Sequence, residues 1–92
     1  MKEFKDIQWK QHKIGNGSIQ GLLMLDNGIE LSVVAGPSMY STPKFAGSSP
    51  DEFSSFEVAV FDTDGKFIGM DDDMVLGWQS RLDIDHLIKK YS

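Results

Sequence analysis

The tripeptide Asp26-Asn27-Gly28 lies between two apolar runs, residues 18–25 and 29–35. An Asn-Gly pair in such a place is the strongest short-range signal for a β-hairpin, because both residues tolerate the positive φ angles of a tight turn. In the second run, Ile29, Leu31 and Val33 occur at every other position, which is the period of a strand. We therefore predict an antiparallel hairpin at the centre of the fold.

The same period of two predicts further strands over residues 4–13, 53–61 and 66–70. Clusters of turn formers separate these runs, at Gly15-Asn16-Gly17 and at Asp62-Thr63-Asp64-Gly65. The apolar run over 74–79 fits either an edge strand or an irregular core segment.

The C-terminal residues predict a helix over 84–91. One apolar stripe recurs at helical spacing, formed by Ile84, Leu87, Ile88 and Tyr91. Asp83 is the predicted N-cap, and Leu82 with Leu87 would form a hydrophobic staple. The predicted fold class is therefore α+β, an antiparallel β-sheet of about five strands with one short C-terminal helix packed on it. The 92 residues fit a single domain.

Composition excludes several kinds of chemistry. The chain has no Cys, so it forms no disulfide, no thiolate zinc site and no cysteine nucleophile. No apolar run approaches the ~20 residues that span a bilayer, and the first residues lack the apolar segment of a signal peptide. We therefore expect a cytoplasmic protein that does not enter a membrane.

Charge is distributed unevenly along the chain. Residues 51–85 contain ten carboxylates and two basic residues, a formal charge of −8 within a chain of net charge −5. Such a segment repels phosphate backbones and attracts basic surfaces or cations. Trp9 among Lys5, Lys10 and Lys13 offers a stacking platform for nucleic acid as an alternative, but four N-terminal lysines are few for that role. We expect a protein partner with a basic surface and no direct nucleic-acid contact.

No motif predicts catalysis, a metal or a cofactor. Counted from Asp62, an EF-hand loop requires Gly at the sixth position, whereas the glycine here is at the fourth. His12 and His86 have no neighbour at metal-ligand spacing, and no serine lies in a nucleophile motif. The glycines at 15 and 17 are not followed by the Lys of a phosphate loop. We therefore expect a protein that is not an enzyme and has no cofactor.

Residues 36–52 are predicted to form a long loop, since Pro, Gly and Ser interrupt every period there. Loops of this length in small domains are usually functional or disordered. Met39, Tyr40, Lys44 and Phe45 lie in this loop, and two interpretations of them stay open, a partner-binding element or a lid folded onto the sheet. The predicted partner-binding residues are these four together with Asp62, Asp64, Asp71, Asp72 and Asp73.

The succession of strands and turns also carries a resemblance. The segments concerned are residues 27–37, Tyr40, residues 56–61 and residues 72–77. This pattern, which covers the middle and C-terminal two-thirds of the chain, resembles small uncharacterised accessory proteins of tailed bacteriophages. The resemblance implies no site residue. It implies a protein that binds and disables a host protein, including nucleic-acid-guided defence complexes in the manner of anti-CRISPR proteins.

Three functions follow as hypotheses. The first is a protein–protein inhibitor acting in the host cytoplasm as a monomer or small homo-oligomer. The second is a module that sequesters a small ligand or nucleotide, for which only Lys44, Lys66 and Arg81 could line a basic pocket. The third is a structural or assembly protein of a particle.

Overall fold

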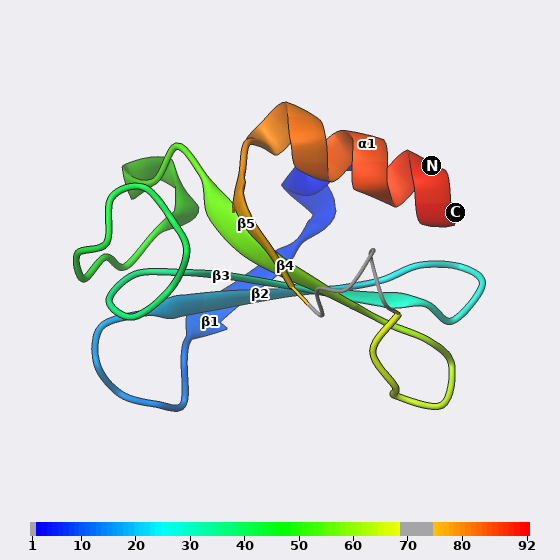
Figure 1. Ribbon diagram of the computed structural model, residues 1–92, viewed down its shortest axis with the longest axis horizontal. Coiled ribbons are helices and arrows are strands. Elements are labelled where there is room, and N and C mark those ends of the chain that lie inside the picture. Colours follow the sequence, from blue (N-terminus) through cyan, green and yellow to red (C-terminus); the bar gives the residue numbers. More distant parts are fainter. Residues whose placement is uncertain (1, 69–74) are drawn as a thin grey trace.

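The structure is a computed structural model that describes residues 2–68 and 75–92. Five antiparallel strands form one sheet whose spatial order β1-β2-β3-β4-β5 follows the sequence (Figure 1). They are β1 (Gln8–Gln11), β2 (Ile19–Met24), β3 (Glu30–Ala35), β4 (Phe56–Phe61) and β5 (Val75–Gln79). The helix α1 (Arg81–Tyr91) follows β5 and lies against one face of the sheet. The predicted α+β fold class is confirmed.

The central hairpin is formed by β2 and β3. Between them the Leu25 amide donates to the Ile29 carbonyl at 2.7 Å and the Gly28 amide donates to the Leu25 carbonyl at 3.0 Å. Gly28 has a φ of 88°, in the left-handed region that a residue without Cβ adopts at least cost. The turn predicted at Asn27-Gly28 is therefore present.

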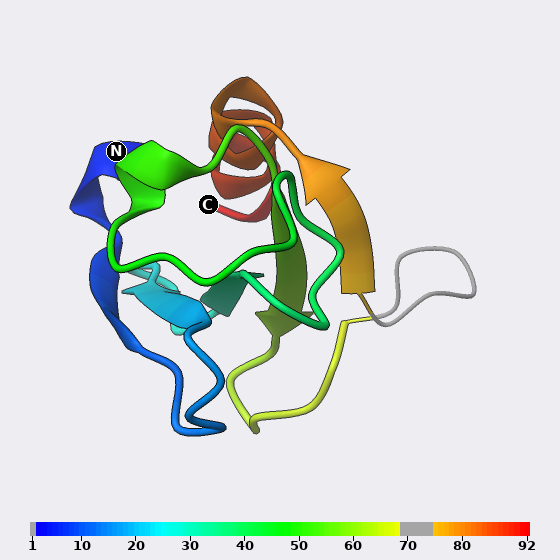
Figure 2. The same cartoon turned by 90° about the vertical axis from the view of Figure 1, so that its left-hand side faces the viewer.

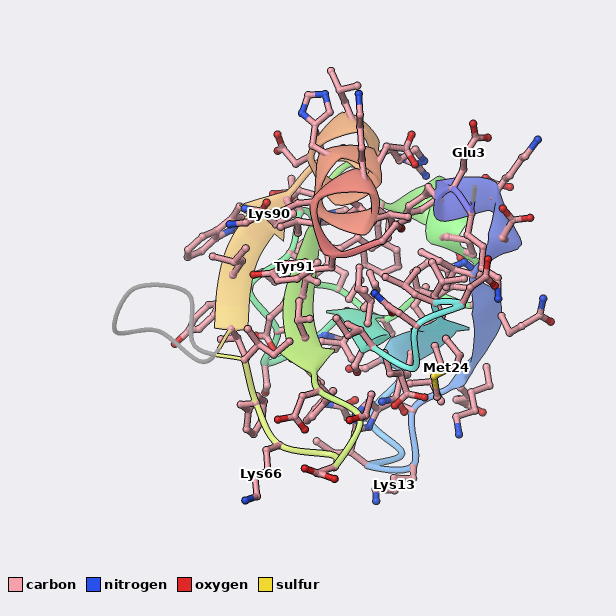
Figure 3. The ribbon with its side chains drawn as sticks, turned by 90° about the vertical axis from the view of Figure 1, so that its right-hand side faces the viewer. Glu3, Lys13, Met24, Lys66, Lys90 and Tyr91 are labelled. Atoms are coloured by element: carbon pink, nitrogen blue, oxygen red, sulfur yellow. The ribbon has the colours of Figure 1, made fainter. Side chains whose placement is uncertain are left out.

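The sheet has a covered face and an open face. On the covered face the alternate residues of β2 to β4 meet the buried Ile84 and Ile88 of α1. The largest fully buried apolar side chains there are Ile19, Leu31, Val33, Phe56, Val58, Val60, Ile84 and Ile88. No helix in the described ranges lies on the open face, from which the turns 12–17 and 62–67 project (Figures 1 and 3).

The helix begins one turn earlier than the sequence pattern indicated. Ser80 is the N-cap: its hydroxyl accepts from the Asp83 amide at 3.1 Å, and the Asp83 carboxylate accepts from the Ser80 amide at 3.0 Å. Asp83 is thus the third residue of a capping box and not the cap, so that prediction was wrong. The predicted staple is absent as well, because Leu82 lies inside the helix and is 63% exposed.

The N-terminal segment is not one long strand. Phe4–Asp6 form a 3₁₀ turn before β1 starts at Gln8. The turn lets the Phe4 ring pack on Phe56, with centroids 5.3 Å apart, while the Phe4 amide donates to the Asp85 carboxylate at 2.7 Å. These contacts tie the start of the chain to the helix, which a straight strand over 4–13 would not allow.

The strand predicted over 66–70 is also absent where the structure describes it. Phe67 makes an isolated bridge with Phe61, and the Ile68 amide donates to the Val60 carbonyl at 2.8 Å. Residues 69 and 70 lie outside the described residues. Of the two alternatives for 74–79, the edge strand is present from Val75.

The loop between β3 and β4 is held at both ends. Pro50–Glu52 form a 3₁₀ turn, and Thr42 makes an isolated bridge with Ser55. Arg81 donates from its guanidinium to the carbonyls of Phe53, at 2.9 Å, and Pro50, at 2.7 Å.

Within the described ranges, neither the 3₁₀ turns nor α1 is long and apolar enough to cross a membrane.

Candidate functional site

A groove of about 260 Å³ lies on the open face of the sheet. Its floor comes from β2, β3 and β4, and its sides come from the two projecting turns, the start of β5 and the start of the long loop. The lining residues are His12, Gln20, Ser32, Val34, Met39, Glu57, Ala59, Phe61, Phe67 and Val75. We call this hollow the open-face groove.

The strand register explains why polar side chains line its floor. Val34 pairs with Gln20 on one side and Glu57 on the other, so these three residues form one row across the sheet. In the next row, Ser32 lies beside Ala59. The Gln20 side-chain amide donates to the Ser32 hydroxyl at 3.1 Å and joins the two rows. The polar positions follow from the alternation of side chains along each strand.

Glu57 is the only carboxylate that lines the groove, as far as the structure describes the chain. One of its oxygens, Oε1, accepts from the Tyr40 backbone amide at 3.2 Å. Residues 2–68 and 75–92 contain a single ion pair, between the exposed Lys5 and Glu3, so no described cation neutralises Glu57. The carboxylate is half-buried and is held in place by a neutral donor.

Beside the groove lies an aromatic pair, Tyr40 and Trp78, whose ring centroids are 5.1 Å apart. The Trp78 amide donates to the Tyr40 carbonyl at 2.8 Å, which brings the long loop against β5 (Figure 2). Gly77 permits this approach, because a Cβ there would lie 2.8 Å from the Tyr40 Cβ. The Lys44 ammonium lies 5.5 Å from the centre of the Tyr40 ring.

Trp78 owes its position to a bulge in the edge strand. Phe56 pairs with Gln79 and Val58 with Leu76, so Glu57 faces two residues of β5. Trp78 is the second of these and has a φ of 53°, in the left-handed region that bulky residues rarely adopt. Bulges redirect side chains, and here the indole is 57% exposed.

The four predicted loop residues have different surroundings. Met39 is buried and lines the open-face groove. Tyr40 is about half exposed and lies with Lys44. Phe45 is 75% exposed, the largest fraction among the big apolar side chains that the structure describes. The loop therefore combines both interpretations, with Met39 folded onto the sheet and Tyr40 and Phe45 facing solvent.

Of the predicted aspartates, the two that the structure describes, Asp62 and Asp64, do not line the open-face groove. Asp62 shapes its own turn, because its carboxylate accepts from the amides of Asp64 at 2.9 Å and Lys66 at 3.0 Å. Asp64 is exposed in that turn. Asp71, Asp72 and Asp73 lie outside the described residues. No group of three possible metal ligands occurs in the described part of the chain.

The described carboxylates of residues 51–68 and 75–85 lie at separate places on the molecule. Asp51 and Glu52 precede β4, whereas Asp62 and Asp64 follow it, and six strand residues span roughly 20 Å. Glu52 belongs to the capping box of the 3₁₀ turn at Pro50–Glu52, and Asp83 belongs to the capping box of α1. The Ser48 and Ser49 amides lower the pKa of Glu52, and the Ser80 amide lowers that of Asp83. The described carboxylates thus form no single acidic face.

Sequence reasoning missed Trp78, His12 and the polar floor of the groove. Alternation separated Ser32 and Glu57 from the apolar faces of their own strands, but the register that joins them with Gln20 came only from the structure. No sequence pattern indicates that Trp78 is exposed, because this residue lies in an apolar run. Of the three basic residues considered for a nucleotide pocket, Arg81 is bound to two backbone carbonyls.

Comparisons of the chain with protein-family models, with curated proteins and with solved structures found no match.

Proposed function

We propose that this protein acts by binding another protein, through a surface that contains the aromatic pair Tyr40 and Trp78. The observation that carries the proposal is the backbone of Trp78. A bulky residue in a left-handed conformation costs roughly 1 kcal/mol or more, and such strain clusters at functional sites. Because the indole is 57% exposed, burial in this molecule does not account for that cost.

The chemistry of the surface supports protein binding. Tyr, Trp and Met are enriched at interface cores, and Trp and Tyr dominate binding hot spots. The backbone that carries the aromatic pair is held by the Trp78–Tyr40 and Tyr40–Glu57 hydrogen bonds, so little backbone freedom remains to be lost on binding. Phe45 and Lys44 extend the same loop with a large apolar group and a charge.

The class of partner is proposed from charge and resemblance. A net charge of −5 favours association with a basic surface, such as a nucleic-acid channel. The resemblance to bacteriophage accessory proteins supports a host cytoplasmic target. We therefore propose inhibition of a host nucleic-acid-binding or defence complex as the outcome of binding.

The test compares two exposed apolar side chains. Wild-type protein and the variants Trp78→Ala and Leu82→Ala are used to capture partners from host lysate, and the affinity for the captured protein is then measured. Trp78→Ala is expected to weaken binding by ~2 kcal/mol or more and to change the melting temperature little. Leu82→Ala is the matched control, since Leu82 is 63% exposed on the helix, and it should bind as the wild type does.

Equal binding by both variants would contradict the proposal, as would the lack of any specifically captured protein. The double variant Tyr40→Ala with Phe45→Ala extends the test along the loop. A large loss of stability in that variant would assign these side chains to the core and not to an interface.

A further inference from the structure

The open-face groove presents hydrogen-bond acceptors to a ligand. Glu57 uses Oε1 for the Tyr40 amide, and within the described ranges its Oε2 has no protein donor. Gln20 uses its amide nitrogen for Ser32, which leaves its carbonyl oxygen facing no described donor. A ligand that suits this set is rich in N–H donors.

The charge of the groove is also uncompensated. The Nδ1 atom of His12 accepts from the Ile14 amide at 3.1 Å, so this ring is engaged within its own turn. Residues 69–74 contain no Lys, Arg or His, so their side chains bring no cation to Glu57. Lys13 and Lys66 belong to the two projecting turns, and their ammonium groups point away from the sheet (Figure 3). A cationic ligand would neutralise the negative charge of the Glu57 carboxylate.

Aromatic rings also line the groove that contains the Glu57 carboxylate. Phe61 and Phe67 line the groove, with their ring centroids 4.7 Å apart. The backbone amide of Tyr40, not its ring, contacts the groove through its hydrogen bond to Glu57. A guanidinium combines five N–H donors with a flat face that stacks on aromatic rings, whereas an ammonium is a compact and strongly hydrated charge. The lining therefore favours arginine over lysine.

We propose that the open-face groove receives an arginine side chain of the protein partner, with its guanidinium paired to Glu57. This inference rests on the proposed function and names the chemistry that the partner must present. The volume of about 260 Å³ fits one side chain, since pockets for drug-sized molecules begin at about 300 Å³. This arginine is then the one residue of the partner's basic surface that enters the groove.

The inference is tested with a small probe and the whole chain. N-acetyl-arginine amide is titrated into ¹⁵N-labelled protein, and the amide shifts of Ser32, Tyr40 and Glu57 are followed by NMR. N-acetyl-citrulline amide, which is neutral and of similar shape, is the probe control. We expect saturable shifts at these amides with arginine, no saturation with citrulline, and weaker binding of N-acetyl-lysine amide.

Two variants locate the charge. Glu57→Gln keeps an acceptor for the Tyr40 amide and is expected to weaken arginine binding about tenfold. Glu30→Gln is the matched control, because Glu30 is half-buried on the same face and lies outside the groove lining. It removes the same charge and should change the affinity less than about twofold.

Three results would overturn the inference: equal binding of citrulline, equal binding of lysine, or equal loss in the two variants. Shifts confined to other parts of the chain would overturn it too. The proposed function is judged separately by Trp78→Ala. If that variant loses the partner while the arginine probe fails, protein binding stands and the arginine anchor falls.

Discussion

The two faces of the sheet are made by the same strands, yet they differ in nearly every physical respect. The covered face is apolar and closed, with Phe56 and Val58 fully buried beneath Ile84 and Ile88. The open face mixes Gln20, Ser32 and Glu57 with apolar neighbours, and it is hollowed between two turns. The covered face therefore supplies most of the apolar burial that stabilises the fold. The polar side chains of the open face add little to that burial, so their presence calls for another role.

The largest expected effect comes from placing a charge on the covered face. Ile88→Asp should unfold the protein, because a buried carboxylate without a partner costs several kcal/mol. Leu82→Asp on the same helix is the control and should melt close to wild type, since Leu82 is exposed. Thermal melting by circular dichroism measures both. Similar melting of Ile88→Asp and wild type would mean that α1 is not docked on the sheet.

A smaller loss of stability is expected from single substitutions on the two faces of β4. Phe56 and Phe61 stand at the two ends of β4, the first on the covered face and fully buried, the second on the open face and half-buried. Phe56→Ala should lower the free energy of unfolding by about 3–5 kcal/mol, and Phe61→Ala by clearly less. Urea denaturation gives both values. Equal losses of unfolding free energy would show that Phe61 on the open face stabilises the fold as much as Phe56 on the covered face.

The smallest effect separates the helix itself from the packing beneath it. Ser80→Ala removes the N-cap hydroxyl and should cost about 1 kcal/mol of stability. The Ser80 amide lowers the pKa of Asp83 below its ordinary value of 3.8. The stability from this carboxylate is therefore fully present above pH 3.8 and is lost as the pH falls through the lowered folded-state pKa.

Melting temperatures measured from pH 6 down to pH 2 test that dependence. The decline below pH 4 should be shallower for Asp83→Asn than for wild type, because the amide side chain does not titrate there. Parallel curves for the two proteins would exclude Asp83 as a source of the acid sensitivity.

The covered face was largely predictable from the sequence, and the site was not. The stripe containing Ile84 and Ile88 and the turn at Asn27-Gly28 are local signals, so periodicity and turn chemistry were enough to find them. The cap was misplaced because Ser80 and Asp83 are both good capping residues, and the apolar stripe marks only where burial starts. The left-handed Trp78 depends on a register shift between β4 and β5, which no local preference encodes. The groove likewise requires two turns, distant in sequence, to project from one face.

Arg81 links the start of α1 to the end of the long loop. This residue begins α1, lies over the rings of Phe4 and Phe56 at 5.1 and 5.3 Å, and holds the end of the long loop through two carbonyls. Lifting the helix from the sheet would therefore break the contacts that hold the end of the loop at Pro50 and Phe53. In hydrogen exchange, the amides of α1 and those of the loop end should open together as one cooperative unit. The stability of the loop end would therefore depend on the docking of the helix.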